Sequence, residues 1–368
     1  MRCGSSWQRF TVRIRCQCKK NTLMRSPLNH LARTKKLPLK WIATSCLTLL
    51  LGGLVFCQDY RNPPALQVSL QPSLGYKGGS IGEHLFNMDG YGQQVTFAPP
   101  GGRQISFLQW DVYGMMVVGL DVEFQYRAFS AQLYGRAGIP MICGKMDDFD
   151  WNTTRGHQTH FSTHTNNLTD YFMAGGFLGW TFASPDRKLL LTPMAGFSWQ
   201  QTAMVARDGY RQYVPSDKQE TTPWTDDLEK KYFDGDVISY RHEVFQVDLQ
   251  FRITYNHNPR LYFQLDTSIH PVIGAFGYDT HILRNLQFLD YNMKGQLGFG
   301  AALTVGYQVI PRHFLTVKVD YNYLPVVIGQ TYMKSTSQHY YYPDSSSRGG
   351  ASHWFAGVTL GWKFNLFQ

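Results

Sequence analysis

The amino-acid sequence predicts an all-β fold: a ten-stranded antiparallel transmembrane β-barrel with short periplasmic turns and long extracellular loops. Long segments alternate strictly between apolar and polar side chains, the polar positions carry charges in mid-segment, and short turns alternate with long polar connections. The composition agrees, since 15% of the 368 residues are aromatic, only 17% are charged and 34 are glycine. Such a mixture suits many strands joined by turns.

The amino-terminal 57 residues differ in charge from the rest of the chain. They hold eleven Lys or Arg and no acid, which leaves 24 basic against 26 acidic residues beyond them, although the whole chain has a net charge of +9. A basic segment ending at Lys40 precedes a short apolar run over 41–56, the pattern of a secretory signal peptide. The basic excess therefore belongs to a leader and does not indicate a nucleic-acid partner.

We accordingly divide the chain into a leader, residues 1–57, and a barrel, residues 58–368. Two alternatives stay open within the leader: translation starting at Met24, and a lipid attached to Cys57. Beyond the leader the only cysteine is Cys143, so no intrachain disulfide is expected in the exported chain.

The alternation of side chains distinguishes a membrane barrel from a soluble β-sandwich. In 244–254, 315–323 and 354–366, one face is apolar or aromatic throughout, whereas the other carries residues such as Asp248, Arg252, Lys318 and Asp320. A soluble sandwich buries its apolar face and has no reason to place charges along the centre of every strand. Lipid outside and a hydrogen-bonded polar interior account for both faces.

The connections between these segments give the strand count and the direction. Four short turns are predicted at 125–128, 184–187, 256–259 and 310–312, and five long loops at 88–102, 144–163, 210–236, 277–288 and 334–350. They separate ten strands, at 65–87, 103–124, 128–143, 164–183, 187–209, 237–255, 260–276, 289–309, 313–333 and 351–366. An even count with short periplasmic turns is the outer-membrane pattern, which places the five loops outside the cell.

Two of the long loops contain the candidate chemistry. Asp148 and Asp150 are two residues apart, as are Asp279 and His281. In an extended backbone, side chains at this spacing point to the same side. Two such pairs facing each other can hold a water molecule and deprotonate it.

Four segments of the chain resemble the omptins, ten-stranded outer-membrane endoproteases of Gram-negative bacteria. The resemblance covers about residues 65–366, and it depends on four segments found in the family's order: Gly75-x8-Glu83, Gly101-Gly102-Arg103-x-x-Ser106-x-Leu108-x-Trp110, Gly144-x-Met146-x-Asp148-x-Asp150-Trp151, and Asp279-x-His281. No single segment is specific, but each falls in the expected strand or loop.

The resemblance implies a role for each candidate residue. Asp279 would orient His281, His281 would act as general base on a water, and Asp148 and Asp150 would hold that water from the opposite wall. Glu83 would lie in the pocket that receives a basic substrate side chain. The implied reaction is cleavage of peptide bonds near Arg or Lys, with no covalent intermediate and no metal.

The resemblance also implies the setting. The protein is expected in the bacterial outer membrane as a monomer, with its active site facing outward and outer-membrane lipid around it. Peptides or proteins would be its substrates, with host plasma proteins and cationic peptides as candidates. No cofactor is expected, although omptins require lipopolysaccharide bound on the barrel exterior, and the resemblance leaves the same dependence open for this protein.

One departure from the family pattern concerns the substrate pocket. Omptins carry a second acid two residues before the Asp of Asp-x-His, and here that position is Gly277. The preference for Arg or Lys is therefore less secure than the hydrolytic chemistry.

Alternative functions make use of other features. A catalytically inactive barrel acting as an adhesin or host-protein binder would use the loops 210–236 and 334–350, and it would have no need for all four candidate catalytic residues. A porin ranks last, because ten strands enclose a narrow lumen. A zinc site at His157, His160 and His164 is disfavoured, since these spacings converge on a helix and not on an extended loop.

Overall fold

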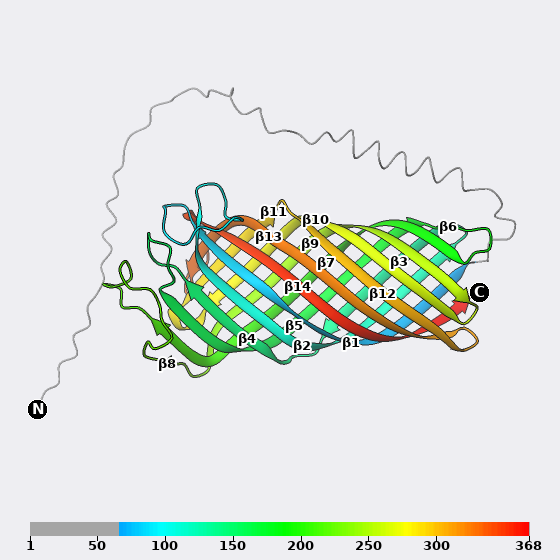
Figure 1. The fold of residues 1–368 in the computed structure, drawn as a ribbon, viewed down its shortest axis with the longest axis horizontal. Coiled ribbons are helices and arrows are strands. Elements are labelled where there is room, and N and C mark those ends of the chain that lie inside the picture. The colour runs from blue at the N-terminus through cyan, green and yellow to red at the C-terminus, as the bar shows by residue number, and fades with distance from the viewer. Residues whose placement is uncertain (1–65, 368) are drawn as a thin grey trace, which may run out of the picture. The chain divides into compact units, whose positions relative to one another are not determined.

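The computed structural model describes residues 66–367, which form a single antiparallel sheet closed into a barrel (Figure 1). The predicted leader, residues 1–57, lies outside the described residues and stays a prediction. Within residues 66–367 no helix is long or apolar enough to cross a membrane.

Fourteen strand segments make up this sheet. They are β1 (Gln67–Asn87), β2 (Arg103–Tyr126), β3 (Phe129–Gly138), β4 (Met141–Asp150), β5 (His160–Trp180), β6 (Phe182–Ala183), β7 (Leu189–Tyr213), β8 (Lys231–Tyr232), β9 (Asp236–Asn258), β10 (Leu261–His281), β11 (Leu286–Lys294), β12 (Leu297–Ile310), β13 (His313–Ser335) and β14 (Tyr342–Phe367), with a 3₁₀ turn at Ile282–Arg284. Segments β3 and β4 are two parts of one barrel strand, as are β5 and β6, and β11 and β12, whereas β8 lies within a loop. The ring therefore contains ten strands, which confirms the predicted fold class.

Two of the interruptions have local causes. Pro140 separates β3 from β4, and proline has no N–H to donate to the neighbouring strand. Gly295, with φ of 98°, separates β11 from β12 in a conformation that only glycine adopts readily.

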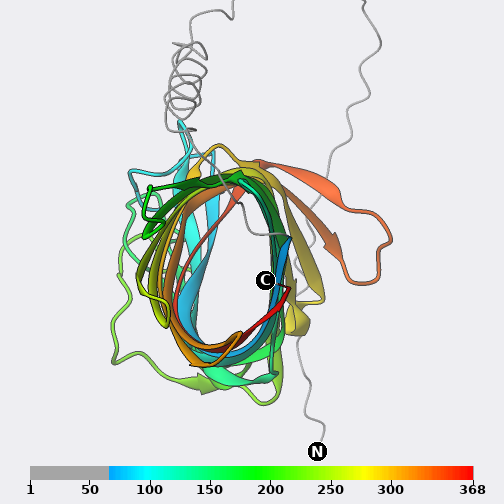
Figure 2. The same cartoon turned by 90° about the vertical axis from the view of Figure 1, so that its right-hand side faces the viewer.

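The first and last strands close the ring. β1 pairs with β14 over almost its whole length, from Val68 opposite Phe367 to Asn87 opposite Ser347. Figure 2 shows the resulting ring from the end at which the chain terminates. No sheet edge is left open to lipid, as a membrane barrel requires.

The four predicted short turns are all present. They connect β2 to β3, β6 to β7, β9 to β10 and β12 to β13. Three of them contain an arginine in the left-handed region, Arg127 (φ 54°), Arg187 (φ 56°) and Arg312 (φ 67°), which lets the chain reverse within a few residues. The long loops lie at the opposite end of the barrel (Figure 1).

Three predicted strand ends are wrong by five residues or more. The strand predicted at 351–366 begins at Tyr342, within the loop predicted at 334–350. The strands predicted at 128–143 and 260–276 continue to Asp150 and His281, so the two candidate pairs lie on strand ends and not in loops. Acidic or basic side chains occur on both faces of the β4 end, as at Asp147 and Asp148, which breaks the apolar alternation by which the strand was recognised. Polarity alone does not distinguish such a strand end from a loop.

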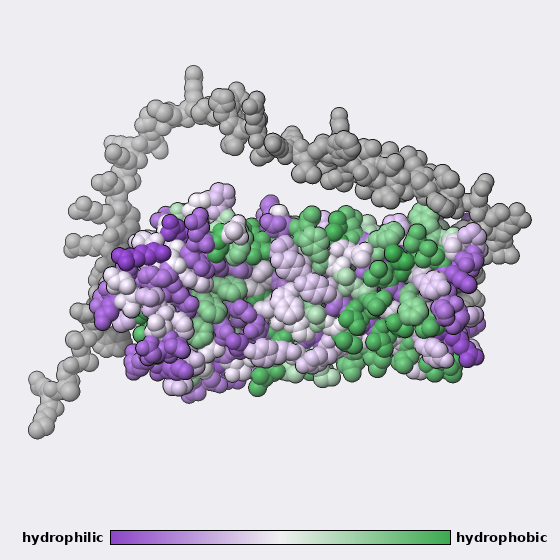
Figure 3. All heavy atoms as spheres, in the orientation of Figure 1, coloured by the Kyte–Doolittle hydropathy of each residue, from purple (hydrophilic) through white to green (hydrophobic). Residues whose placement is uncertain are grey.

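The exterior carries an apolar belt, which we define as the outward-facing, exposed apolar side chains nearer the short turns. Leu120, Leu249, Leu303, Val319 and Leu360 are representative, each 43–52% exposed. Figure 3 shows this belt as a hydrophobic zone, with hydrophilic surface toward the loops and at the short-turn rim. Strands of 21 to 26 residues exceed the roughly 9–11 that cross a bilayer. The barrel therefore extends beyond the membrane on the loop side.

The interior at the level of this belt is polar and tightly connected. Lys77 pairs with Asp320 at 2.7 Å and Arg252 with Asp266 at 2.7 Å, across facing or neighbouring strands. Further ion pairs there join Arg136 to Asp121, and Lys363 and Arg252 to Glu123. The charges that alternate with the apolar belt thus compensate one another inside the lumen and occupy it.

Candidate active site

The first wall of the candidate site is the outer end of β4. Asp148 lies opposite Leu108 on β2 and Ser162 on β5, and Asp150 follows on the same side of the strand. Ser106 donates a hydrogen bond from Oγ to Asp148 Oδ1 at 3.4 Å. We call Asp148 and Asp150 the acid pair.

Asp147, between these two, shows that the strand alternates as predicted. Its carboxylate accepts a hydrogen bond from Thr163 Oγ1 at 2.6 Å and pairs with Lys145 at 2.5 Å. Asp147 is absent from the residues that line the cleft on the other side of the strand. Of the three acids in 147–150, Asp148 and Asp150 therefore face the cleft, whereas Asp147 pairs with Lys145 on the other side of the strand.

The second wall is the outer end of β10. Asp279 Oδ2 lies 2.7 Å from His281 Nε2, and the Asp279 side chain is almost fully buried. The imidazole ring also meets Phe288 of β11 edge-on, with centroids 5.5 Å apart. The histidine is thereby held by a hydrogen bond at one nitrogen and by an aromatic ring beside it. We call these two residues the acid–imidazole pair.

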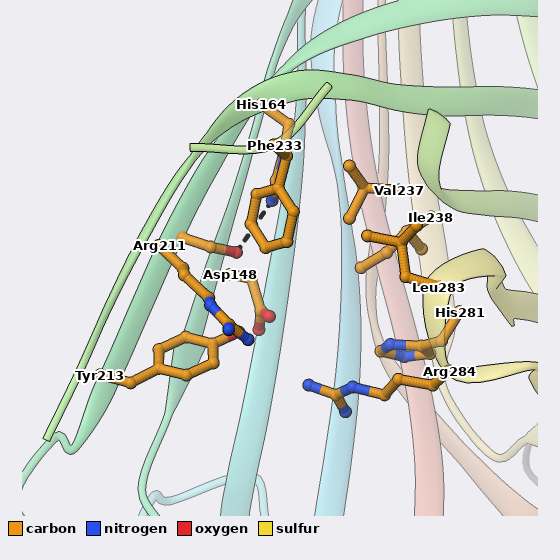
Figure 4. Close-up of a pocket in the computed structure, with 11 residues that line it drawn as sticks. Asp148, His164, Arg211, Tyr213, Phe233, Val237, Ile238, His281, Leu283 and Arg284 are labelled. Atoms are coloured by element: carbon orange, nitrogen blue, oxygen red, sulfur yellow. Dashed lines mark hydrogen bonds between the residues drawn. The ribbon is translucent and has the colours of Figure 1, made fainter. Parts of the chain in front are cut away.

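A single cleft brings the predicted residues together. Its lining includes Glu83 from β1, the acid pair and the acid–imidazole pair. Figure 4 shows Asp148 on one wall and His281 with Arg284 on the opposite wall, their side chains directed toward the space between. All five site residues predicted from the sequence are therefore neighbours in space, although they come from three separate strands.

The site lies beyond the apolar belt. Ile142 is the last exposed large apolar side chain on β4, and Ile273 is the last on β10. The acid pair and the acid–imidazole pair come after them along each strand, on the loop side. The cleft therefore lies on the loop side of the apolar belt and not at the level of the lipid.

Burial sets the protonation of the acid pair. Burial raises the pKa of Asp148 well above its ordinary value, the charge of Asp150 raises it further, and the nearby Arg284 lowers it. Burial likewise raises the pKa of Asp150, whereas the Ser106 hydrogen bond, Arg284 and His281 lower it. Two adjacent buried carboxylates do not both ionise readily, so burial and mutual repulsion favour one proton shared by the acid pair.

Glu83 occupies a deeper part of the cleft. It lies on β1 between Leu108 of β2 and Ala351 of β14, and its Oε2 is buried without a hydrogen-bond partner among the described residues. Burial raises the pKa of Glu83 well above its ordinary value, and the charges of Asp279 and Asp290 raise it further. A carboxylate in this position is a strong hydrogen-bond acceptor, and no Lys or Arg among the described residues forms an ion pair with it.

Sequence reasoning missed four polar residues of the cleft. Arg284, in the 3₁₀ turn after His281, and Asp290, His160 and Tyr213 all contribute to its lining. Burial lowers the pKa of His160 to about 4, with Arg284 and Arg211 adding to this effect, so the imidazole is neutral. Of these residues only His160 could have been found from the sequence, because it lies directly opposite Asp150 where β4 pairs with β5. Recognising that neighbour requires the register of the two strands.

The three histidines considered for zinc do not converge. His157 Nε2 donates to the carbonyl oxygen of Gln219 at 2.8 Å, and His164 Nδ1 donates to that of Asp208 at 2.6 Å. In the part of the chain that the structure describes, no group of three His, Cys, Asp or Glu side chains is arranged to hold a metal ion.

Comparisons with known proteins agree with the architecture. The model of the Omptin family matches residues 65–366. Among solved structures, the chain is similar to the outer membrane protease OmpT from Escherichia coli, with a TM-score of 0.71 and 17% sequence identity, over 82% of this chain and 97% of that chain. At this identity the likeness shows the shared fold. A search of curated proteins found no match.

Other solved barrels are much less similar. The transport unit of the autotransporter AIDA-I from Escherichia coli gives a TM-score of 0.32 and 12% identity, covering 88% of this chain and 97% of that chain. The Pseudomonas putida toluene transporter TodX gives 0.30 and 11%, covering 83% and 90%. The family match spans nearly the whole barrel, and the chain therefore belongs to the Omptin family of outer-membrane proteases.

Proposed function

We propose that the protein is a surface endopeptidase that cleaves peptide bonds near basic residues by means of a water molecule activated by His281. The observation that carries the proposal is the placement of the acid–imidazole pair across one cleft from the acid pair. A barrel that only binds other proteins has no need for a buried carboxylate aimed at an imidazole opposite two further carboxylates.

The acid–imidazole pair fixes which nitrogen acts as the base. Because Nε2 of His281 donates its proton to Asp279 Oδ2 at 2.7 Å, the lone pair of the neutral ring is on Nδ1. A water between the walls gives a proton to Nδ1 as its oxygen attacks the carbonyl carbon of the scissile bond. The carboxylate of Asp279 stabilises the imidazolium that forms.

The acid pair completes the reaction from the opposite wall. Its ionised oxygen accepts a hydrogen bond from the attacking water and so orients it. The shared proton donates a hydrogen bond to the carbonyl oxygen as negative charge develops there. When the C–N bond breaks, the proton held on His281 passes to the leaving nitrogen, and the imidazole returns to its neutral form.

Glu83 gives the cleft its preference for a basic side chain of the substrate. Its buried, unpartnered carboxylate gains a charge-assisted hydrogen bond when a Lys or Arg side chain enters the cleft. Proteins and peptides with exposed basic residues, including host plasma proteins and cationic peptides, are the corresponding substrate class. The long loops and the cleft would face outward from the bacterial outer membrane, and the barrel would act as a monomer.

The test is cleavage of a mixed peptide library by the protein purified from outer membranes, with and without lipopolysaccharide. His281→Ala and Asp148→Asn are compared with Asp147→Asn, a matched control that removes the neighbouring acid on the other side of β4. We expect cleavage next to basic residues, loss in the first two variants, and near-normal activity in the control. Activity only when lipopolysaccharide is added would establish the lipid dependence that the omptin resemblance implies.

Two results would contradict the proposal. Equal activity of His281→Ala and the unaltered protein would exclude the assigned base. No cleavage by a folded barrel under either lipid condition would favour the adhesin or host-protein binder, which is then tested by binding to immobilised host proteins.

A further inference from the structure

Glu83 is not the only carboxylate buried without a cation in the cleft. Asp290, on β11, also lines the cleft, and Glu83 and Asp290 are only 7% and 5% exposed. Neither side chain forms an ion pair with a Lys or Arg within residues 66–367. This differs from the lumen at the level of the apolar belt, where acids such as Asp320 and Asp266 are paired with a base.

The position of Asp290 depends on two glycines. Gly277 is its direct partner across β10 and β11, and a Cβ atom at Gly277 would lie 3.6 Å from Asp290 Cβ and 3.1 Å from Tyr240 Oη. On the other side, a Cβ at Gly349 would lie 1.8 Å from Asp290 Oδ1. The Asp290 carboxylate therefore extends from β11 over β13 toward β14, through space that any larger residue at 349 would fill.

A hydrogen bond holds the carboxylate in this direction. Thr331, directly opposite on β13, donates from Oγ1 to Asp290 Oδ1 at 2.7 Å. Burial raises the pKa of Asp290 to about 7, with the charge of Asp279 adding to the rise and the Thr331 hydrogen bond opposing it. A positive charge placed nearby would remove this cost of ionisation.

A further polar group near the two acids lacks a partner. Tyr240 Oη is buried without a hydrogen-bond partner among the described residues, whereas a hydrogen bond from Trp110 lowers the pKa of Glu83. The two rings stack with centroids 5.7 Å apart. Buried polar groups are normally satisfied, so an unpartnered hydroxyl beside two unpaired carboxylates indicates a ligand group that is both cationic and rich in N–H donors.

We propose that Asp290 is a specificity-determining residue of the cleft, which together with Glu83 and Tyr240 forms a recess for the guanidinium of a substrate arginine. Asp290 lies directly opposite Gly277 on the neighbouring strand β10, where the absence of a side chain at Gly277 leaves space beside it. The acceptors lie on three different strands, β1, β9 and β11, an arrangement that suits the five fixed donors of a guanidinium better than a compact ammonium. This inference rests on the proposed endopeptidase function and identifies the side chain that the cleft prefers.

The experiment compares Asp290→Asn with the unaltered protein on three peptides that differ only at the basic position: arginine, lysine, and citrulline, the uncharged counterpart of arginine. Asn keeps the size of the side chain and a hydrogen bond to Thr331, and it removes a buried unpaired charge, so folding is preserved. We expect kcat/KM for the arginine peptide to fall about 10- to 100-fold, as for loss of a hydrogen bond to a charged group. The value for the citrulline peptide should change less than threefold.

A control and a second measurement keep the two proposals separable. Asp344→Asn removes an acid outside the cleft and should leave all three rates unchanged. Peptide binding is also measured in the His281→Ala background, where no cleavage interferes, and Asp290→Asn should there lower the preference for arginine over citrulline by the same factor.

The possible results lead to distinct conclusions. If cleavage is normal but the arginine preference survives Asp290→Asn, or if both peptides lose activity equally, the assignment of Asp290 is wrong and the endopeptidase proposal stands. If no peptide is cleaved but arginine-selective binding depends on Asp290, the endopeptidase proposal fails and the recess is established.

Discussion

Asp279→Asn tests the acid–imidazole pair most directly. The substitution keeps the size of the side chain and removes the negative charge that lies 2.7 Å from His281 Nε2. Asp279 is 3% exposed, so solvent screens this interaction little. In the proposed transition state the imidazole has gained a proton and is positively charged. In the variant a neutral amide replaces the carboxylate beside it.

The magnitude follows from the geometry. Charges on a carboxylate and an imidazolium about 4 Å apart attract by about 4 kcal/mol at an effective dielectric constant of about 20. Since about 1.4 kcal/mol corresponds to a tenfold change in rate, kcat should fall by about 10³-fold. KM should change little, because in the proposed mechanism the charge on the ring develops only in the transition state.

The assay is steady-state cleavage of a fluorogenic peptide with one arginine, with folding monitored by the temperature at which the barrel unfolds in detergent. Asp227→Asn, in the exposed loop between β7 and β9, serves as the matched control. A loss of kcat below tenfold in a folded variant would refute the role assigned to Asp279. A rise in KM with unchanged kcat would show that Asp279 binds substrate and does not assist the base.

Three further predictions concern charge and membrane contact. Arg284→Gln removes a charge that lowers the pKa of both carboxylates of the acid pair, so the acidic limb of the kcat/KM profile should move to higher pH, because one carboxylate must be ionised for activity. Lys77→Met leaves the carboxylate of Asp320 buried without its partner, and the free energy of unfolding should fall by about 2–4 kcal/mol, measured by denaturant titration in detergent. Leu303→Arg places a charge in the apolar belt and should destabilise the barrel in lipid bilayers by about 2–4 kcal/mol, measured by the same titration in vesicles.

Each of these has a matched control. Lys230→Gln removes another loop cation and should leave the pH profile in place, and an unchanged profile in Arg284→Gln would contradict the assigned electrostatics. Lys77→Met combined with Asp320→Asn should recover part of the lost stability; no recovery would show that the pair is not the cause. Tyr232→Arg, at an exposed loop position, should have little effect, and equal destabilisation by Leu303→Arg and Tyr232→Arg would contradict the position of the belt.

The sequence was sufficient for the barrel because lipid and lumen impose opposite demands on alternate residues. The run from Leu315 to Tyr323 alternates without exception, and it lies within β13 as predicted. Above the membrane this contrast disappears. Lys145 and Asp147 occupy one face of β4 while the acid pair occupies the other, so the segment has the composition of a loop although it is a strand.

The candidate site was predictable only where its residues are close in the sequence. Spacings of two residues revealed Asp148 with Asp150 and Asp279 with His281. Asp290 gives no such signal, because its relation to Glu83 depends on ring closure and on the exact register of β11. Arg284 was missed for another reason: it lies on a 3₁₀ turn, where no alternation indicates the direction of the side chain.

Closure of the ring between β1 and β14 also determines when the enzyme comes into existence. Glu83 is carried by the first strand, the acid pair by the outer end of β4, and Asp279 by a strand more than 120 residues farther on. The walls of the cleft face each other only after the sheet has curved and its two ends have met. A chain still in transit through the periplasm therefore has the residues of a protease without an assembled site, and its carriers and neighbouring precursors are safe from it. Proteolysis would therefore begin with assembly of the barrel in the membrane.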